Sequence, residues 1–386
     1  MLRNSFSPRL LKKAQMQGGK RCGVRGVLST YVAAPRERAN PPEADRWAFF
    51  SSLLIGRDAS LTREVPMLIV VPDDSPPALA GTPALDRLRK IDEVRLYDSD
   101  ATDPVVLASR LKDAAVAVNI RGRTRFTAEV LQACPKLKLI SIWGTGTDNV
   151  DLKAAAARGI TVTNTPGANA LAVAEHTMAL ILAVVKQLAP ADRAMRQGGW
   201  PRNLVPQLRG KRLGLIGTGL IGREVAAMGR GLGLEVVAWT FHPNANLAVS
   251  LGLRYVELDE LLQTSDIVSV HLRATPDTQQ FLNRERLGML KPGAILVNTA
   301  RGALIDEAAL VEWLREKRIA GVGLDVFETE PLPAGHPLTA LPNVLLTPHC
   351  AGMTPDSNLI GLDMAAENIE NFLKGKPTHV VAGPGR

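Results

Sequence analysis

The chain has 386 residues, of which 46% are hydrophobic and 22% are charged, a composition typical of a soluble globular protein long enough for two domains. The most apolar run, residues 178–185, is far too short to cross a bilayer, so no membrane span is expected. The formal net charge of +8 raises the question of a nucleic-acid partner.

That charge is concentrated in residues 1–66, which carry 12 basic and 5 acidic residues. The rest of the chain carries 34 basic and 33 acidic residues and few aromatic ones, so we expect no nucleic-acid partner for it. Residues 1–66 are rich in Pro and Gly and lack sustained periodicity. They are interpreted as a basic, disordered N-terminal extension or as translated sequence upstream of a start at Met67, with a transit peptide as the alternative.

The three cysteines, Cys22, Cys134 and Cys350, lie far apart and form no C-x-x-C pair. This spacing argues against a thiolate zinc site and a disulfide framework, and it favours a reducing, cytoplasmic location. The six histidines are also scattered without an H-x-x-x-H pair. We therefore expect no metal.

From Met67 onward, strand and helix patterns alternate. The sequence predicts strands at 67–71, 93–97, 115–120, 137–143 and 160–164, with helices at 84–91, 104–112, 127–133 and 151–157. One long, apolar helix is predicted at 168–188, where it would connect two units or form a subunit contact. A second alternation follows from 211 to about 347, with strands at 212–216, 234–239, 267–271, 294–298, 319–325 and 343–347. A tail helix at 355–373 is expected to pack back on the first unit.

The second alternation opens with a glycine-rich turn. Gly217, Gly219 and Gly222 form G-x-G-x-x-G between a short apolar strand and a helical segment, and a second strand closes a βαβ unit. The glycines permit a tight turn, close approach of backbone N–H groups to a pyrophosphate, and packing of the helix on the strand. The helix start would direct its positive end at that pyrophosphate. We therefore predict two Rossmann-like, doubly wound parallel α/β sheets.

Polar side chains follow three later strands of this unit, namely Arg301, Glu330 and His349. Ligands of such sheets bind at the carboxyl ends of the strands. Reduction of a 2-oxo acid needs a cation for the carboxylate, an acid for the carbonyl oxygen, and a group that tunes this acid. Arg, His and Glu suit these roles, because Arg binds carboxylates bidentately and a carboxylate raises the pKa of a neighbouring histidine.

At these residues the sequence resembles the D-isomer-specific 2-hydroxyacid dehydrogenase family, which includes phosphoglycerate, glycerate/hydroxypyruvate and glyoxylate enzymes. The resemblance extends from about Met67 to the C-terminus and is carried by WGTGTDNVDL (143–152), GLIGTGLIG (214–222), VNTARGALID (297–306), GLDVFETEPLP (323–333) and LLTPHCAG (345–352).

The resemblance implies that Arg301 binds substrate, that Glu330 pairs with the histidine, and that His349 is the proton donor. Glu330 is preferred to Glu328 because the family's acid directly precedes the proline, here Pro331. The resemblance also implies that Thr145 and Gly146 contact the substrate carboxylate. The residues that it implies for the cofactor are Gly217, Gly219, Leu220, Ile221, Gly222, Thr240, Thr299, Ala300, Asp325 and Gly352.

It also implies a substrate domain of residues 67–167 plus 351–386 and a dinucleotide-binding domain of residues 168–350, with the active site in the cleft between them. The expected activity is NAD(P)-dependent interconversion of a small 2-oxo acid and a D-2-hydroxy acid, by a homodimer. The alternative is a binding protein that senses NADH, like the family's corepressors.

Other polar residues receive less specific interpretations. His271 is predicted to be a hydrogen-bonded structural residue, His176 a packing or helix-interface residue, and Cys350 a small packed residue. Arg121 and Arg123 would either contact a second anionic group or remain solvated. Thr240 stands where an acid would select NAD, so the sequence slightly favours NADP or dual use, although no arginine follows it in the loop.

Overall fold

The computed structural model describes residues 67–120 and 122–384. The described residues belong to one unit by their internal contacts. The extension predicted for residues 1–66 therefore lies outside the described residues.

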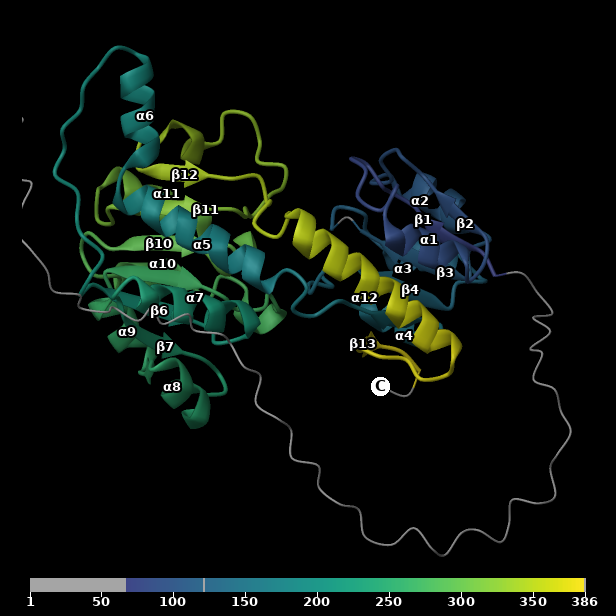
Figure 1. Cartoon of the computed structure of the whole chain (residues 1–386). Helices are drawn as coiled ribbons and strands as arrows, with labels where there is room; N and C mark the ends of the chain where they lie inside the picture. Colours follow the sequence, from purple (N-terminus) through teal and green to yellow (C-terminus); the bar gives the residue numbers. More distant parts are fainter. Residues whose placement is uncertain (1–66, 121, 385–386) are drawn as a thin grey trace, which may run out of the picture. The chain divides into compact units, whose positions relative to one another are not determined.

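The first sheet is built from the first alternation and the end of the chain (Figure 1). Its strands run in the order β13-β5-β4-β3-β1-β2, and all neighbouring pairs are parallel except β13 with β5. The strands are β1 (Ile69–Val71), β2 (Val94–Leu96), β3 (Val116–Asn119), β4 (Leu139–Ile142), β5 (Thr161–Thr163) and β13 (Val380–Ala382). Its helices are α1 (Pro83–Arg89), α2 (Pro104–Leu111), α3 (Ala128–Gln132), α4 (Leu152–Ala157) and α12 (Pro355–Leu373).

The second sheet has the order β12-β11-β10-β9-β6-β7-β8, and its neighbouring strands are parallel. The strands are β6 (Arg212–Ile216), β7 (Glu235–Trp239), β8 (Arg254–Tyr255), β9 (Ile267–Val270), β10 (Ile295–Asn298), β11 (Gly321–Leu324) and β12 (Val344–Leu346). Its helices are α5 (Ala170–Val185), α6 (Leu188–Arg196), α7 (Leu220–Gly231), α8 (Ala245–Leu251), α9 (Leu258–Thr264), α10 (Arg284–Gly288) and α11 (Glu307–Arg315), with short 3₁₀ turns η1 (Pro276–Thr278), η2 (Gly302–Leu304) and η3 (Pro337–Ala340).

Apolar side chains cover both faces of each sheet. In the second sheet, α5 and α7 bury one face through residues such as Ile181 and Val225, and α9 and α11 bury the other through Leu261 and Leu310. Fully buried strands of this kind read as continuous apolar runs because helices cover both sides. The structure confirms the predicted α/β class with two parallel sheets.

The tail helix α12 belongs to the first sheet, as expected. Leu362 and Ile369 pack in one core with Leu85 and Leu88 of α1. The helix begins with a capping box in which Thr354 accepts a hydrogen bond from the N–H of Ser357. Figure 1 shows α12 beside α1 and across the sheet near β4.

Three elements differ from the sequence prediction. The helix predicted at 168–188 ends at Val185, because Gln187 adopts a left-handed conformation with φ of 51° and a separate helix, α6, follows. The short strand β8 was not predicted. Strand β13 was also missed, and its antiparallel pairing means that the first sheet is mixed rather than purely parallel. The domain limits at 167/168 and 350/351 stay a prediction.

Among the described residues, no individual helix has the length and apolar character needed to cross a membrane; the bent pair α5 and α6 meets these criteria only when taken together.

The contact of Gly361 with Trp143 gives a test of how α12 packs on β4. A Cβ at Gly361 would overlap the indole Nε1 and Cδ1 of Trp143. We expect Gly361→Ala to lower the free energy of unfolding by about 1–3 kcal/mol, because overpacking displaces the indole or the helix. Gly231→Ala is the matched control, since Gly231 lies in helix α7 with open space around it. Urea unfolding followed by circular dichroism measures both, and equal stability of the two variants would contradict this packing.

Candidate functional site

The glycine-rich turn lies at the point where the second sheet reverses its strand order. Gly217 follows β6, and its neighbours in the sheet are β7 on one side and β9 on the other. A Cβ at Gly217 would lie 2.6 Å from the carbonyl oxygen of His271, and one at Gly222 would overlap the carbonyl of Gly217. Only glycine fits at these two positions, so the backbone can form the narrow turn that a dinucleotide requires.

Around Gly219 the space is open. Nothing lies within 4 Å of a Cβ built there, and Gly219 is the N-cap of α7 without a side-chain hydrogen bond. The first N–H groups of α7 are thus available to an anion at the positive end of the helix dipole. The predicted residues Leu220 and Ile221 form the first turn of this helix, where Leu220 is half exposed.

His271 follows β9 next to this turn. Its Nε2 lies 2.9 Å from Ser269 Oγ, whereas its Nδ1 is buried and has no hydrogen-bond partner among the described residues. Burial lowers the pKa of His271 to about 4, so the ring is neutral at pH 7. The prediction that this histidine is fully hydrogen-bonded is therefore wrong for one of its nitrogens. An orphaned buried polar atom beside a glycine cradle fits a site that a bound cofactor would complete.

Most other predicted cofactor residues also follow strands of this sheet. Thr240 is partly exposed directly after β7. Thr299 follows β10, is buried, and places its Oγ1 2.8 Å from Thr177 Oγ1 of α5. The N–H of Ala300 donates to Asn298 Oδ1 at 2.9 Å. Gly352 lies against Asn169, whose Nδ2 would be 2.7 Å from an added Cβ.

His349 and Glu330 form a hydrogen-bonded pair. His349 Nδ1 lies 2.7 Å from Glu330 Oε2, and Glu330 Oε1 accepts a hydrogen bond of 3.0 Å from the N–H of Phe327. Burial would raise the pKa of Glu330, but these hydrogen bonds and the charges of His349 and Arg301 outweigh it and hold the pKa below its usual range. Glu330 is therefore ionised at neutral pH, and His349 Nε2 is the ring nitrogen left to face a ligand.

The turn that carries His349 is anchored by Asp325. His349 has a φ of 50°, in the left-handed region, and its N–H donates to the backbone oxygen of Asp325 at 2.8 Å. The next two N–H groups, of Cys350 and Ala351, donate to the Asp325 carboxylate at 3.0 and 2.9 Å. The sequence assigned Asp325 to the cofactor; its carboxylate is buried and engaged in holding this turn.

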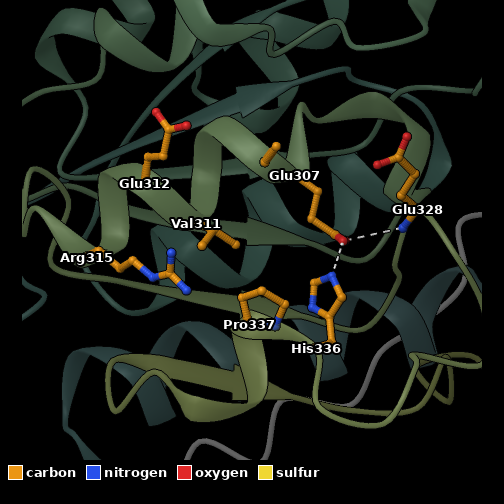
Figure 2. Close-up of a pocket in the computed structure, with 8 residues that line it drawn as sticks. Glu307, Val311, Glu312, Arg315, Glu328, His336 and Pro337 are labelled. Carbon is orange, nitrogen blue, oxygen red and sulfur yellow. Dashed lines mark hydrogen bonds and ion pairs between the residues drawn. The ribbon is translucent and has the colours of Figure 1, made fainter.

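The loop that carries Glu330 is anchored from the other side by Glu307. As Figure 2 shows, the Glu307 carboxylate faces the His336 ring and the N–H of Glu328, at 3.0 and 3.3 Å. These residues border a pocket of about 340 Å³ that contains none of Arg301, Glu330 and His349. We assign this pocket no chemistry, because its polar groups serve to fix the loop.

Arg301 lies against the loop that follows β4. Its guanidinium pairs with Asp148 through Nε and Nη2 at 3.3 and 3.2 Å, and Nη1 donates to the backbone oxygen of Ala300. A Cβ at Gly146 would overlap Arg301 Nη2, so the glycine lets the guanidinium approach the backbone. Thr145 precedes it in an exposed position, and its backbone oxygen accepts from Asn164 Nδ2 at 2.8 Å.

The role of Asp148 was missed, although it lies inside one of the quoted motifs. Burial would raise the pKa of Asp148, but the charge and hydrogen bonds of Arg301 hold it below the usual range. Nothing in the sequence shows which cation this carboxylate pairs with, because the two residues are far apart in the chain.

Two of the less specific interpretations concern side chains that the structure describes. His176 Nε2 lies 3.0 Å from Thr347 Oγ1 and 3.6 Å from Asp325 Oδ1, so this side chain also makes polar contacts. Arg123 is committed to ion pairs with Asp73 and Asp100, at 3.0 and 3.1 Å. Arg121 lies outside the described residues.

The sequence and the fold were compared with known proteins. Residues 178–351 match the family model described as D-isomer specific 2-hydroxyacid dehydrogenase, NAD binding domain. Glyoxylate reductase from Aeropyrum pernix is 40% identical over 303 residues, which is 76% of this chain and 90% of that protein. D-3-phosphoglycerate dehydrogenase from Archaeoglobus fulgidus is 40% identical over 264 residues, or 68% of this chain, which thus spans 50% of that protein.

Two solved structures have a similar fold. D-lactate dehydrogenase from Aquifex aeolicus, in complex with NAD and lactic acid, has a TM-score of 0.74 and 30% identity, covering 82% of this chain and 100% of that chain. An acyclic imino acid reductase in complex with NADPH and D-arginine has the same TM-score, identity and coverage.

The lowered pKa of Glu330 predicts how stability depends on pH. A carboxyl with a folded pKa below its unfolded value stabilises the fold above the unfolded value, near pH 4.3, and loses this contribution as pH falls through the folded pKa. We expect Glu330→Gln to be less stable than the wild type by at most about 1 kcal/mol at neutral pH, because the pair is partly exposed. In urea unfolding this difference should shrink at acid pH.

Glu328→Gln is the control, since Glu328 is the exposed acid two residues away. An equal loss in both variants, or a difference that grows toward acid pH, would contradict the assignment.

Proposed function

Because the chain belongs to the D-isomer-specific 2-hydroxyacid dehydrogenase family, we propose that it interconverts a small 2-oxo acid and a D-2-hydroxy acid with NAD or NADP. The observation that carries this proposal is the Glu330–His349 pair, which follows β11 and β12 at the same edge of the sheet as the glycine turn. We also propose that residues 67–167 and 351–386 are the substrate domain and residues 168–350 the dinucleotide-binding domain.

His349 moves the proton in the proposed reaction. The Glu330 carboxylate accepts a hydrogen bond from His349 Nδ1 and stabilises the imidazolium. His349 Nε2 can then donate a proton to the carbonyl oxygen of the substrate in reduction and take it back in oxidation. The nicotinamide, when bound, supplies or accepts the hydride at the carbonyl carbon. The left-handed turn at His349, held by Asp325, fixes the direction of the ring.

Arg301 and the loop at Gly146 are proposed to hold the substrate carboxylate. The guanidinium is bidentate toward Asp148 and would offer the same fork to a carboxylate. Asp148 already balances much of this charge, and Arg123 is occupied by Asp73 and Asp100. This balance favours a small singly charged acid over a phosphorylated one.

We propose that the protein either prefers NADP or uses NAD and NADP equally. The structural neighbours bind both, since one contains NAD and the other NADPH. Thr240, at the end of β7, places a hydroxyl where an acid would repel a 2′-phosphate.

A 2-oxo-acid panel tests the activity. We expect oxidation of NADPH, and of NADH to a comparable degree, with glyoxylate or hydroxypyruvate, and weaker activity with phosphohydroxypyruvate. His349→Ala should lower kcat by about 10²–10⁴-fold through loss of the proton donor, and Arg301→Ala should chiefly raise KM. Arg284→Ala, which removes a surface pair with Glu312, is the control and should keep the activity.

Unchanged turnover in both site variants would refute the site. A kcat/KM ratio strongly favouring NADH would refute the cofactor preference. Nucleotide-dependent oligomerisation without turnover on any acid would support the alternative of an NADH-sensing binding protein.

We infer further that the protein is a cytoplasmic homodimer joined through α6 and the loop after it. Helix α6, all of whose residues are described, buries none of its side chains. Leu188 and Met195 on this helix, and Trp200 and Leu204 beyond it, are exposed, with Leu204 fully accessible. In Figure 1 this segment extends from the end of α5. A second copy of the same segment is the proposed partner, because it offers a matching apolar surface.

Sedimentation velocity tests the dimer. The wild type should sediment as a dimer, and the double variant Trp200→Asp/Leu204→Asp should sediment as a monomer. Val249→Asp is the control, because Val249 is a highly exposed apolar residue on α8, away from this segment. A monomeric wild type, or a double variant that remains dimeric, would refute the inferred interface.

A further inference from the structure

Three side chains with metal-ligating atoms meet beside the turn that carries His349. His176 lies on α5, Asp325 follows β11, and Cys350 follows His349. An imidazole nitrogen, a carboxylate oxygen and the thiol sulfur of these residues all lie within 4.8 Å of one another. The three residues come from separate segments, which is why no local Cys or His spacing revealed them.

The distances approach those of a zinc site. Zn²⁺ binds His nitrogen, carboxylate oxygen and Cys sulfur at about 2.0–2.3 Å, so ligand atoms of a tetrahedral site lie about 3.3–3.7 Å apart. His176 Nε2 and Asp325 Oδ1 are 3.6 Å apart, within this range. The Cys350 sulfur lies within 4.8 Å of the other two ligand atoms. A metal ion that replaces this thiol proton would therefore need only a small shift of the sulfur.

The surroundings orient the ligands. The Asp325 carboxylate accepts from the N–H groups of Cys350 and Ala351 and, at 2.6 Å, from Thr347 Oγ1. Thr347 Oγ1 also lies 3.0 Å from His176 Nε2. The two N–H donors fix the direction of the Asp325 carboxylate. The Thr347 hydroxyl bonds the proposed ligand atoms His176 Nε2 and Asp325 Oδ1 themselves, so it is displaced from them when a metal ion binds. The His176 side chain keeps 23% of its surface exposed, so an ion can reach the cluster from solvent.

We propose that His176, Asp325 and Cys350 form a binding site for Zn²⁺. One nitrogen, one oxygen and one sulfur suit Zn²⁺ and exclude Mg²⁺ and Ca²⁺, which prefer oxygen ligands alone. Three protein ligands leave the fourth position open to water. Zinc therefore binds beside the proton donor without using His349 as a ligand.

Zinc at this cluster blocks the cofactor. Asp325 and Gly352 belong to the residues predicted to line the cofactor, and Cys350 lies between His349 and Gly352. This consequence rests on the proposed function, whereas the metal site itself does not. Bound Zn²⁺ and bound NAD(P)H exclude one another, and the metal acts as a reversible inhibitor.

Binding is tested with Co²⁺ as a spectroscopic substitute for Zn²⁺ on the full chain stripped with a chelator. The wild type gives the near-ultraviolet thiolate-to-Co²⁺ charge-transfer band at one equivalent, and Zn²⁺ abolishes it. Cys350→Ser lacks the band, and His176→Gln weakens Co²⁺ binding by at least about tenfold. Cys22→Ser and Cys134→Ser keep the band as matched controls. Absence of the band in the wild type, or its persistence in Cys350→Ser, overturns the site.

Inhibition is tested separately. Zn²⁺ raises the apparent KM for NAD(P)H of the wild type, a chelator reverses the effect, and Cys350→Ser loses it relative to its own activity. Inhibition that persists in Cys350→Ser assigns the metal elsewhere and overturns the proposal. If Zn²⁺ inhibits without competing with NAD(P)H, the claim that metal and cofactor exclude one another is overturned. If no 2-oxo acid is turned over, the proposed function fails, and the Co²⁺ band still decides the metal site.

Discussion

The buried carboxylate of Asp325 is the constraint on which the chemistry of this edge depends. Burying a carboxylate without partners costs several kcal/mol. Here two backbone N–H groups and the Thr347 hydroxyl satisfy it, while its own backbone oxygen receives the N–H of His349. A non-glycine residue in the left-handed region costs about 1–3 kcal/mol, and the charge-assisted hydrogen bonds of Asp325 offset that cost. The imidazole of His349, the proposed proton donor, is thus directed by the contacts of Asp325 with the backbone of its turn.

The topology of the second sheet supplies the rest of the arrangement. Parallel strands present their carboxyl ends at one edge, so the residues after β6, β10, β11 and β12 converge without any local sequence signal. The strand order reverses between β6 and β9, which leaves space for the glycine-rich turn. The neutral ring of His271 borders that space. The neutral His271 ring adds no full charge beside this turn. The positive charge there comes from the N-terminus of α7 and from Arg223, whose Nε donates to the backbone oxygen of Thr218 at 3.1 Å.

Much of this could be predicted from sequence, and the failures have physical causes. Buried strands form continuous apolar runs and amphipathic helices repeat their apolar residues every three to four positions, which is why the two sheets and the tail helix were predicted correctly. Strands β8 and β13 were missed because two or three residues carry no period, and β13 is defined by its partner β5. The break at Gln187 was missed because its left-handed conformation is not encoded by Gly or Pro. Asp148 and the contacts of His176 depend on tertiary neighbours, which single-sequence patterns do not reveal.

The two halves of the site differ in what they depend on. Glu330 and His349 follow adjacent strands of one sheet, and their hydrogen bond is fixed by backbone contacts within that sheet. Arg301 belongs to the same sheet, but Asp148 and Gly146 follow β4 of the other sheet. The charge that Arg301 offers therefore depends on contact between the segments after β4 and β10, whereas the Glu330–His349 pair, the proposed proton donor, does not. Asp148 already engages the guanidinium fork of Arg301. Under the proposed function, a substrate carboxylate would therefore exchange with Asp148, and the strength of that exchange, rather than the acid-base pair, would set the discrimination among 2-oxo acids.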